Sequence, residues 1–193
     1  ASAFRNRAIV YDNKAQYDRA IQDLDQAIKL NPNLASAFNS RGIVYSNKGQ
    51  YDRAIQDLDQ AIKLNPNFAS AFNSRGVVYD HKSQYDRAIQ DYDQAIKLNP
   101  NMAIAFRNRG LVYSNKGQYD RAIQDYDQAI KLDPNDASAF RSRGIAYDNK
   151  AQYDRAIQDY DQAIKLNPNF ASAFNSRGVV YGHKGQHDRA IQD

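Results

Sequence analysis

Histidines are the first residues to consider for metal or acid–base chemistry, because the chain contains no cysteine. There are three of them, and His183 and His187 lie four residues apart, a spacing that can place two imidazoles on one helical face. Gly185 marks an expected turn between them, so the two rings do not share a face. His81 stands alone. We interpret His183 and His187 as exposed loop residues and predict no metal site.

A second candidate is the recurring spacing from Gly42 to Lys48 and Gly49, which is similar to part of a phosphate-binding loop. The glycine spacing is wrong, however, no Ser or Thr follows the lysine, and no strand precedes it. The aspartates are dispersed at about one per helical turn, which is typical of solvated faces and ion pairs rather than of a catalytic dyad. We therefore predict that the chain is not an enzyme and has no cofactor.

An internal repeat defines the elements that must position any binding site. The prolines recur every 34 residues, at Pro32, Pro66, Pro100, Pro134 and Pro168, and the rest of the sequence follows the same period. A period of this length predicts a solenoid or a similar array. We expect a single array made of repeats 1–34, 35–68, 69–102, 103–136 and 137–170 and a partial repeat 171–193.

Each copy reads as a helical hairpin. Apolar and small residues from Ala35 to Tyr45 recur at helical spacing, and Gly49 is a suitable left-handed terminator, although other copies have Ala or Ser there. A second helix is expected from about Asp52 to Leu64, because the residue before a proline is driven out of the helical region. The fold class predicted from this pattern is all-α.

The residues that recur in each copy resemble the tetratricopeptide repeat. In the second copy the matching residues are Phe38, Arg41-Gly42, Tyr45, Ala54, Leu58, Ala61 and Pro66, and Ala8 replaces the glycine in the first copy. The resemblance covers the whole chain. It implies a right-handed superhelical solenoid of antiparallel helix pairs, in which the first helix of each pair lines a concave groove.

One departure from the family pattern is systematic, because an arginine stands where the family usually has leucine. The six arginines are Arg7, Arg41, Arg75, Arg109, Arg143 and Arg177. Since this position lies on the apolar stripe, each guanidinium needs a partner. Asp23, Asp25 and their equivalents can supply it, so we predict an Arg–Asp pair between helices in each repeat. The alternative is a ladder of arginines that faces a polyanion.

Differences between the copies point to a binding face. Twenty-two of the 34 positions are identical in all five complete copies. Every position on the side of the first helix opposite its apolar stripe, here called the outer face, nevertheless differs between copies; in the first copy these residues are Ser2, Arg5, Asn6, Ile9, Asp12 and Asn13. Gene conversion or deliberate construction would give a similar pattern, and individual polar residues there can also be simply solvated. The predicted groove residues are Arg5, Asn6, Ile9, Asn13, Asn39, Ile43, Asn47, Asn73, Val77, His81, Arg107, Asn108, Leu111, Asn115, Arg141, Ile145 and Asn149.

The chemistry of this face suits an extended peptide. Asn side chains can donate to and accept from a peptide backbone, and the aliphatic row that includes Ile9 and Leu111 offers apolar contact. Arg107 and Arg141 are predicted to hold a carboxylate, so an acidic and aliphatic partner is expected. A branch of the family that clamps chaperone C-termini uses Lys and Asn at positions where this chain has Ser and aliphatic residues, which disfavours that activity.

Nucleic acid and membrane partners are disfavoured. In the complete copies the positive charges predicted in the groove equal the negative ones: Arg5, Arg107 and Arg141 against Asp12, Asp80 and Asp148. No predicted groove residue is a Phe, Tyr or Trp that could stack on a base. The formal net charge of +4 is mild and dispersed along the chain. No apolar run approaches the length of a membrane helix, and with no targeting segment in the sequence the cytoplasm is the favoured compartment.

We therefore predict a non-enzymatic scaffold that binds an extended peptide or partner segment in the groove. The alternative from a different class is a structural array that stacks on itself and has no specific peptide ligand. The sequence shows no polar capping repeat, which predicts end-to-end homo-association or fraying of the last helix.

Overall fold

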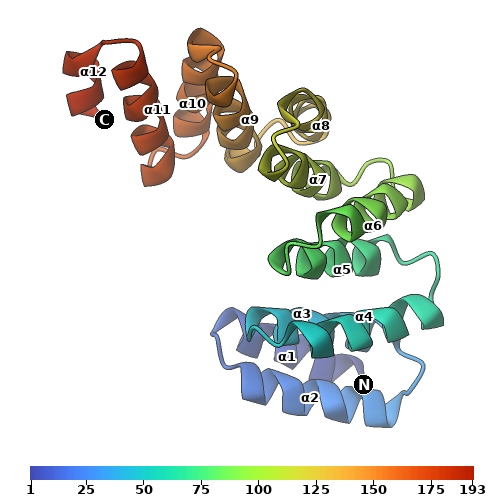
Figure 1. The fold of residues 1–193 in the computed structure, drawn as a ribbon. Coiled ribbons are helices and arrows are strands. Elements are labelled where there is room, and N and C mark those ends of the chain that lie inside the picture. The colour runs from blue at the N-terminus through green and yellow to red at the C-terminus, as the bar shows by residue number, and fades with distance from the viewer. The chain divides into compact units, whose positions relative to one another are not determined.

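The computed structural model describes residues 1–193, which form twelve α-helices and no strand (Figure 1). The first helices of the successive pairs are α1 (Ser2–Asn13), α3 (Ala35–Asn47), α5 (Ala69–His81), α7 (Ala103–Asn115), α9 (Ala137–Asn149) and α11 (Ala171–His183). The second helices are α2 (Tyr17–Leu30), α4 (Tyr51–Leu64), α6 (Tyr85–Leu98), α8 (Tyr119–Leu132), α10 (Tyr153–Leu166) and α12 (His187–Gln192). The predicted all-α class and the helical-hairpin unit are confirmed.

The chain divides into two compact units, residues 1–100 and 101–193. The first unit contains α1 to α6 and the second contains α7 to α12, so each holds three helix pairs. Within a unit, each helix packs against the next, and first helices of successive pairs also touch one another. The first helices of a unit therefore form a continuous row.

The second helices end where the sequence predicts. Asn31 follows the last residue of α2 and is extended, with φ −143° and ψ 91°, because Pro32 excludes the helical conformation from its predecessor. The Asn31 side chain accepts a hydrogen bond from the backbone N–H of Asn33 at 3.1 Å, which closes the turn. The same arrangement recurs after α4 and α10.

The turn inside each pair requires one residue with a left-handed backbone. Gly49, Gly117 and Gly185 have φ between 69° and 75°, as expected for helix terminators. In the other three pairs the same place is taken by residues with a Cβ atom, Ala15, Ser83 and Ala151, with φ between 53° and 56°. A Cβ atom in this conformation costs about 1–2 kcal/mol, because it approaches the following carbonyl oxygen.

Replacing these three residues with glycine should stabilise the chain. We expect Ala15→Gly, Ser83→Gly and Ala151→Gly each to increase the free energy of unfolding by about 0.5–1 kcal/mol, because the relief of strain exceeds the added freedom of the unfolded chain. Urea unfolding followed by circular dichroism measures the change. The matched control is Gly49→Ala, which should destabilise the chain by a similar amount; a stabilising Gly49→Ala would contradict this account.

Close contact between the two helices of a pair depends on a small residue in the first helix. A Cβ atom added to Gly76 would lie 2.7 Å from Cε1 of Tyr92, and Gly110 and Gly144 face Tyr126 and Tyr160 in the same way. In the first pair Ala8 and Leu24 take these two places, and both are fully buried. Leucine thus occurs beside alanine in the first pair and beside Gly42 in the second, where Leu58 would lie 2.7 Å from an added Cβ atom, whereas tyrosine occurs only beside glycine. The two positions are coupled in this sense.

The coupling can be measured with a double-mutant cycle. Gly76→Ala should cost about 1–3 kcal/mol, because the new methyl group meets the buried Tyr92 ring. In a Tyr92→Leu background the same change should cost at least about 1 kcal/mol less, since Ala8 and Leu24 pack together in the first pair. Equal costs in both backgrounds, measured by urea unfolding, would show that the two residues are independent.

Candidate functional site

The repeated arginine is the group that decides which face of the first helix is free for binding. Arg41 donates from Nε and Nη2 to both oxygens of Asp57 at 2.7 Å, and from Nη1 to Asp25 of the preceding repeat at 2.5 Å. Arg75, Arg143 and Arg177 each make the same three bonds to the two equivalent aspartates. The predicted Arg–Asp pair is confirmed, and it also joins one repeat to the next.

Aromatic rings enclose the same guanidinium. The Arg41 guanidinium carbon lies 5.6 Å from the centre of the Phe38 ring and 6.0 Å from that of Tyr45. Cation–π contacts of this kind contribute about 0.5–1 kcal/mol each at partly exposed sites. The side chain is only 19% exposed, against 57% for Arg7, which pairs with Asp23 alone. The arginines are thus held by carboxylates and rings, and they do not form the ladder for a polyanion.

The pKa shifts follow from this environment. Hydrogen bonding to Asp57 raises the pKa of Arg41, so its guanidinium remains charged. Hydrogen bonding to Arg7 lowers the pKa of Asp23. At Asp91 burial is the larger effect, and it raises the pKa of that carboxyl despite the bond to Arg75. The arginine–aspartate pairs inside the later repeats, here called the inner pairs, are therefore costly to bury, and each depends on both partners being present.

Removing one partner of an inner pair should be strongly destabilising. We expect Arg75→Leu to cost about 3–5 kcal/mol, because Asp91 would remain buried without its partner. Adding Asp91→Leu should recover most of that loss, and Arg7→Leu, at the more exposed pair, should cost less than Arg75→Leu. Urea unfolding of the four proteins tests this. A neutral Arg75→Leu would contradict the role assigned to the pair.

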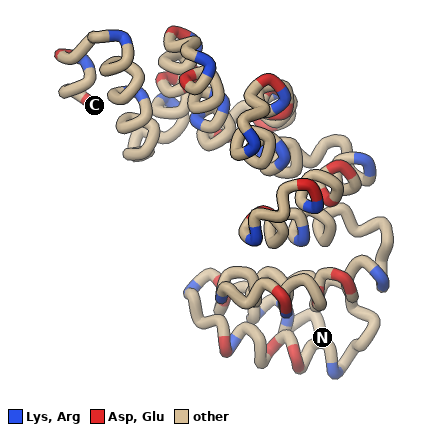
Figure 2. The backbone as a smooth tube through the Cα atoms, viewed as in Figure 1, with Lys and Arg blue, Asp and Glu red and all other residues tan.

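Lysines at the ends of the first helices form a second, weaker link between repeats. Lys82 Nζ lies 2.5 Å from Asp52 Oδ1 at the start of α4, and Lys48 pairs with Asp18 in the same manner. Because the aspartate side chains of these pairs are at least 80% exposed, each pair contributes little to stability. Acidic and basic residues are interspersed in both units (Figure 2).

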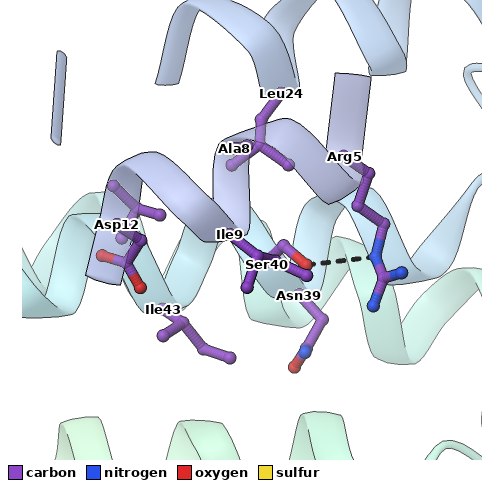
Figure 3. Close-up of a pocket in the computed structure, with 9 residues that line it drawn as sticks. Arg5, Ala8, Ile9, Asp12, Leu24, Asn39, Ser40 and Ile43 are labelled. Atoms are coloured by element: carbon purple, nitrogen blue, oxygen red, sulfur yellow. Dashed lines mark hydrogen bonds between the residues drawn. The ribbon is translucent and has the colours of Figure 1, made fainter. Parts of the chain in front are cut away.

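Several predicted groove residues meet in one pocket of the first unit. A cavity of about 250 Å³ is lined by residues of α1, α2 and α3, with the Leu24 side chain at its inner wall (Figure 3). The full lining is Arg5, Ala8, Ile9, Asp12, Leu24, Asn39, Ser40, Ile43 and Val44. The structure therefore brings together four residues of the predicted set, Arg5, Ile9, Asn39 and Ile43.

The aliphatic row of the predicted groove is on the surface. Ile9, Leu111 and Val179 are 40%, 44% and 48% exposed. Their equivalents Ile43, Val77 and Ile145 are half-buried. Asn6, Asn13 and Asn115 are exposed on the same helices, and Asn73 and Asn108 are half-buried. Exposed aliphatic side chains flanked by amides are what contact with an extended segment requires.

The two arginines that are predicted to hold a carboxylate also make contacts within the chain. Arg107 Nη1 donates to both carboxylate oxygens of Asp136, at 2.9 and 3.2 Å, and Arg141 Nε donates to the backbone oxygen of Ser172 at 3.2 Å. Asp136 also caps α9, since it accepts from the N–H groups of Ser138 and Ala139. The available signal was that only the fourth copy ends in an acidic residue.

Other predicted groove residues join neighbouring repeats. Asn47 Nδ2 donates to Asp12 Oδ1 at 3.0 Å, and His183 Nδ1 lies 3.1 Å from Asp148 Oδ1. The His81 ring stacks on Tyr51 at 5.6 Å between ring centres. The 34-residue register places each of these residues beside the preceding repeat, which the pattern of one helix does not reveal. Leu24 was also missed, although its position was among those that differ between copies.

Family comparisons agree with the repeat pattern. Models described as tetratricopeptide repeat match residues 39–103, 103–136 and 125–158, and one described as TPR repeat matches residues 10–49 and 150–185. The chain belongs to the tetratricopeptide repeat family. Its all-helical architecture is that of a helical repeat solenoid.

Solved structures of tetratricopeptide repeat proteins are similar to this chain. MamA is 28% identical with a TM-score of 0.71, covering 86% of this chain and 96% of MamA. YrrB, described as a TPR protein with an unusual peptide-binding site, is 26% identical with a TM-score of 0.68, covering 90% of each chain. PilF of Pseudomonas aeruginosa is 19% identical with a TM-score of 0.87 and covers 99% of this chain and 87% of PilF, which shows the shared fold.

No curated protein sequence matches the chain. A bilayer span would need a longer and more apolar helix than any in this structure. The family and its solved relatives support a protein-interaction scaffold as the general role of the chain.

Proposed function

We propose that this tetratricopeptide repeat chain is a non-enzymatic scaffold that binds an extended peptide or partner segment along the outer faces of its first helices. The observation that carries this proposal is that each unit has exposed aliphatic residues flanked by side-chain amides on its first helices. The most exposed are Ile9 in the first unit and Leu111 and Val179 in the second. YrrB, a similar protein, is described as having a peptide-binding site, which agrees with this role.

The constancy of the rest of the repeat supports the same function. The Arg–Asp pairs and the buried alanines recur in every complete copy. The residues that stabilise the fold are therefore constant, and stability gives no reason for the outer face to differ between copies. The outer face nevertheless differs at every position between copies. A row of different side chains on a constant framework can recognise different residues of one extended ligand.

The expected ligand is aliphatic, with an acidic group opposite the arginines whose charge is not balanced. Arg107 already binds the Asp136 carboxylate, and Arg5 donates to the Ser36 backbone oxygen and the Ser40 hydroxyl at 3.4 and 3.3 Å. Only Arg107 is paired with a carboxylate, whereas Arg5 and Arg141 donate to neutral oxygens, so their positive charges remain available to an acidic group of the ligand. Contacts to aliphatic side chains and to the peptide backbone remain available.

A peptide-display selection against the purified chain tests the proposal. Peptides with an aliphatic motif should be enriched, and their binding should weaken at least about tenfold when Ile9, Leu111 and Val179 are replaced by serine, since each loses apolar contact. The matched control replaces Gln22, Gln124 and Gln158, exposed on the second helices, with serine and should bind normally.

Two results would count against the proposal. Enriched peptides that bind the serine variant and the control equally well would place the site elsewhere on the chain. No enrichment at all, combined with polymers whose size grows with concentration in light scattering, would favour a self-stacking structural array.

A further inference from the structure

The pocket at Leu24 differs from the equivalent places in the third, fourth and fifth repeats, whereas the second repeat also has a buried leucine, Leu58. The corresponding residues of the third, fourth and fifth copies are Tyr92, Tyr126 and Tyr160, whose side chains are each only 1% exposed. Leu24 is also fully buried, but it has no aromatic ring and no hydroxyl. The first repeat therefore has a smaller side chain at a place that three other repeats fill with a phenol.

The polar groups around the Tyr126 hydroxyl can be compared with those around the cavity at Leu24. Burial raises the pKa of the Tyr126 hydroxyl, and the nearby Ser142 and Ser114 hydroxyls and the Arg107 charge oppose that shift. With the repeat register, the residues of the first pocket that correspond to Ser142, Ser114 and Arg107 are Ser40, Asp12 and Arg5. All three line the cavity beside Leu24, so it keeps the serine and the arginine that lie near the buried phenol of the fourth repeat, and Asp12 takes the place of Ser114.

One polar atom of the pocket has no partner. Asn39 lines the cavity and is only 7% exposed, and its Oδ1 atom is buried without a hydrogen bond. An unsatisfied buried acceptor costs about 1–3 kcal/mol, so a ligand that supplies a donor is favoured here. Ser40 accepts a bond from Arg5 Nε, which leaves its own O–H free to donate to a ligand oxygen.

The size of the cavity fits an aromatic side chain. Its volume of about 250 Å³ exceeds the roughly 150 Å³ of a protein cavity known to admit benzene. Ile9 and Ile43 line the cavity (Figure 3), and Ile9 is 40% exposed, so a ring that enters beside Ile9 meets apolar groups. A hydroxyl on the ring would supply both a donor and an acceptor.

We infer that the pocket formed by α1, α2 and α3 binds a tyrosine side chain of the partner segment. This inference rests on the proposed function, since the tyrosine belongs to a segment that lies along the first helices. The ring occupies the cavity beside Leu24, between Ile9 and Ile43, and its hydroxyl reaches Asn39 and Ser40. The ligand supplies in the first repeat the phenol that the protein supplies for itself in the third, fourth and fifth.

The probe for this pocket is p-cresol, which has the ring and hydroxyl of tyrosine without a backbone. An NMR titration of the methyl-labelled chain should shift the Ile9, Ile43 and Val44 methyl signals, with a dissociation constant on the order of 1 mM for so small a ligand. Toluene, which lacks the hydroxyl, should bind about 2- to 10-fold more weakly. Asn39→Leu should remove that preference for p-cresol over toluene.

The blocking variant is suggested by the chain itself. Ala8→Gly combined with Leu24→Tyr recreates the pair found as Gly110 and Tyr126, so it should fold normally and fill the pocket. The two changes belong together, because a Cβ atom at the glycine would lie 2.8 Å from the tyrosine ring. We expect p-cresol binding to weaken at least about tenfold in this variant. Unchanged binding, or no localised shift in the original chain up to the solubility limit of p-cresol, would overturn the inference.

The peptide selection separates this inference from the proposed function. Enriched peptides that contain tyrosine, and lose affinity for the Ala8→Gly, Leu24→Tyr variant, support both. Enriched peptides that bind the outer face without tyrosine, and bind that variant normally, overturn the tyrosine pocket and leave the scaffold function intact. Binding of p-cresol without any enriched peptide supports the pocket and counts against the peptide scaffold.

Discussion

The structure depends above all on the bonds that the repeated arginines make to aspartates, of which Arg41, Arg75, Arg143 and Arg177 each bind two. Arg41 binds Asp57 in its own repeat through two hydrogen bonds and Asp25 in the preceding repeat through a third. A guanidinium buried to this extent needs carboxylate partners at hydrogen-bond distance. The bonds therefore define how the two helices of a pair align with each other and with the second helix of the preceding pair. The aromatic rings of Phe38 and Tyr45 enclose the guanidinium and complete its surroundings.

This arrangement leaves the opposite side of the first helices available for other contacts. Because the arginine, its aspartates and the buried alanines hold each pair, side chains on the outer side can change without loss of the core. They are not all devoted to a ligand, however. Asn47 and His183 contact the aspartate of the preceding repeat, and Arg107 binds Asp136. The candidate binding surface consists mainly of the aliphatic row and the pocket at Leu24.

The core and the binding surface are connected through one residue of each second helix. Where that residue is tyrosine, its ring fills the space beneath the outer face, and its first-helix neighbour must be glycine. With leucine and Ala8 in the first repeat, a cavity remains. A substitution that looks like ordinary variation of the core therefore changes the shape of the surface that a ligand would meet.

The sequence by itself determined the period, the helix pairs, their ends at Asn31 and Gly49, and the need of the buried arginines for aspartate partners. These features are local or repeat exactly, so spacing, backbone preference and charge suffice to predict them. Only the tertiary structure decided that Arg41 also reaches Asp25, that Arg107 is bound by Asp136, and that a cavity lies beside Leu24. Each of these depends on how one repeat lies against the next and on the volume that remains between side chains, and neither quantity can be read from the period of a single chain.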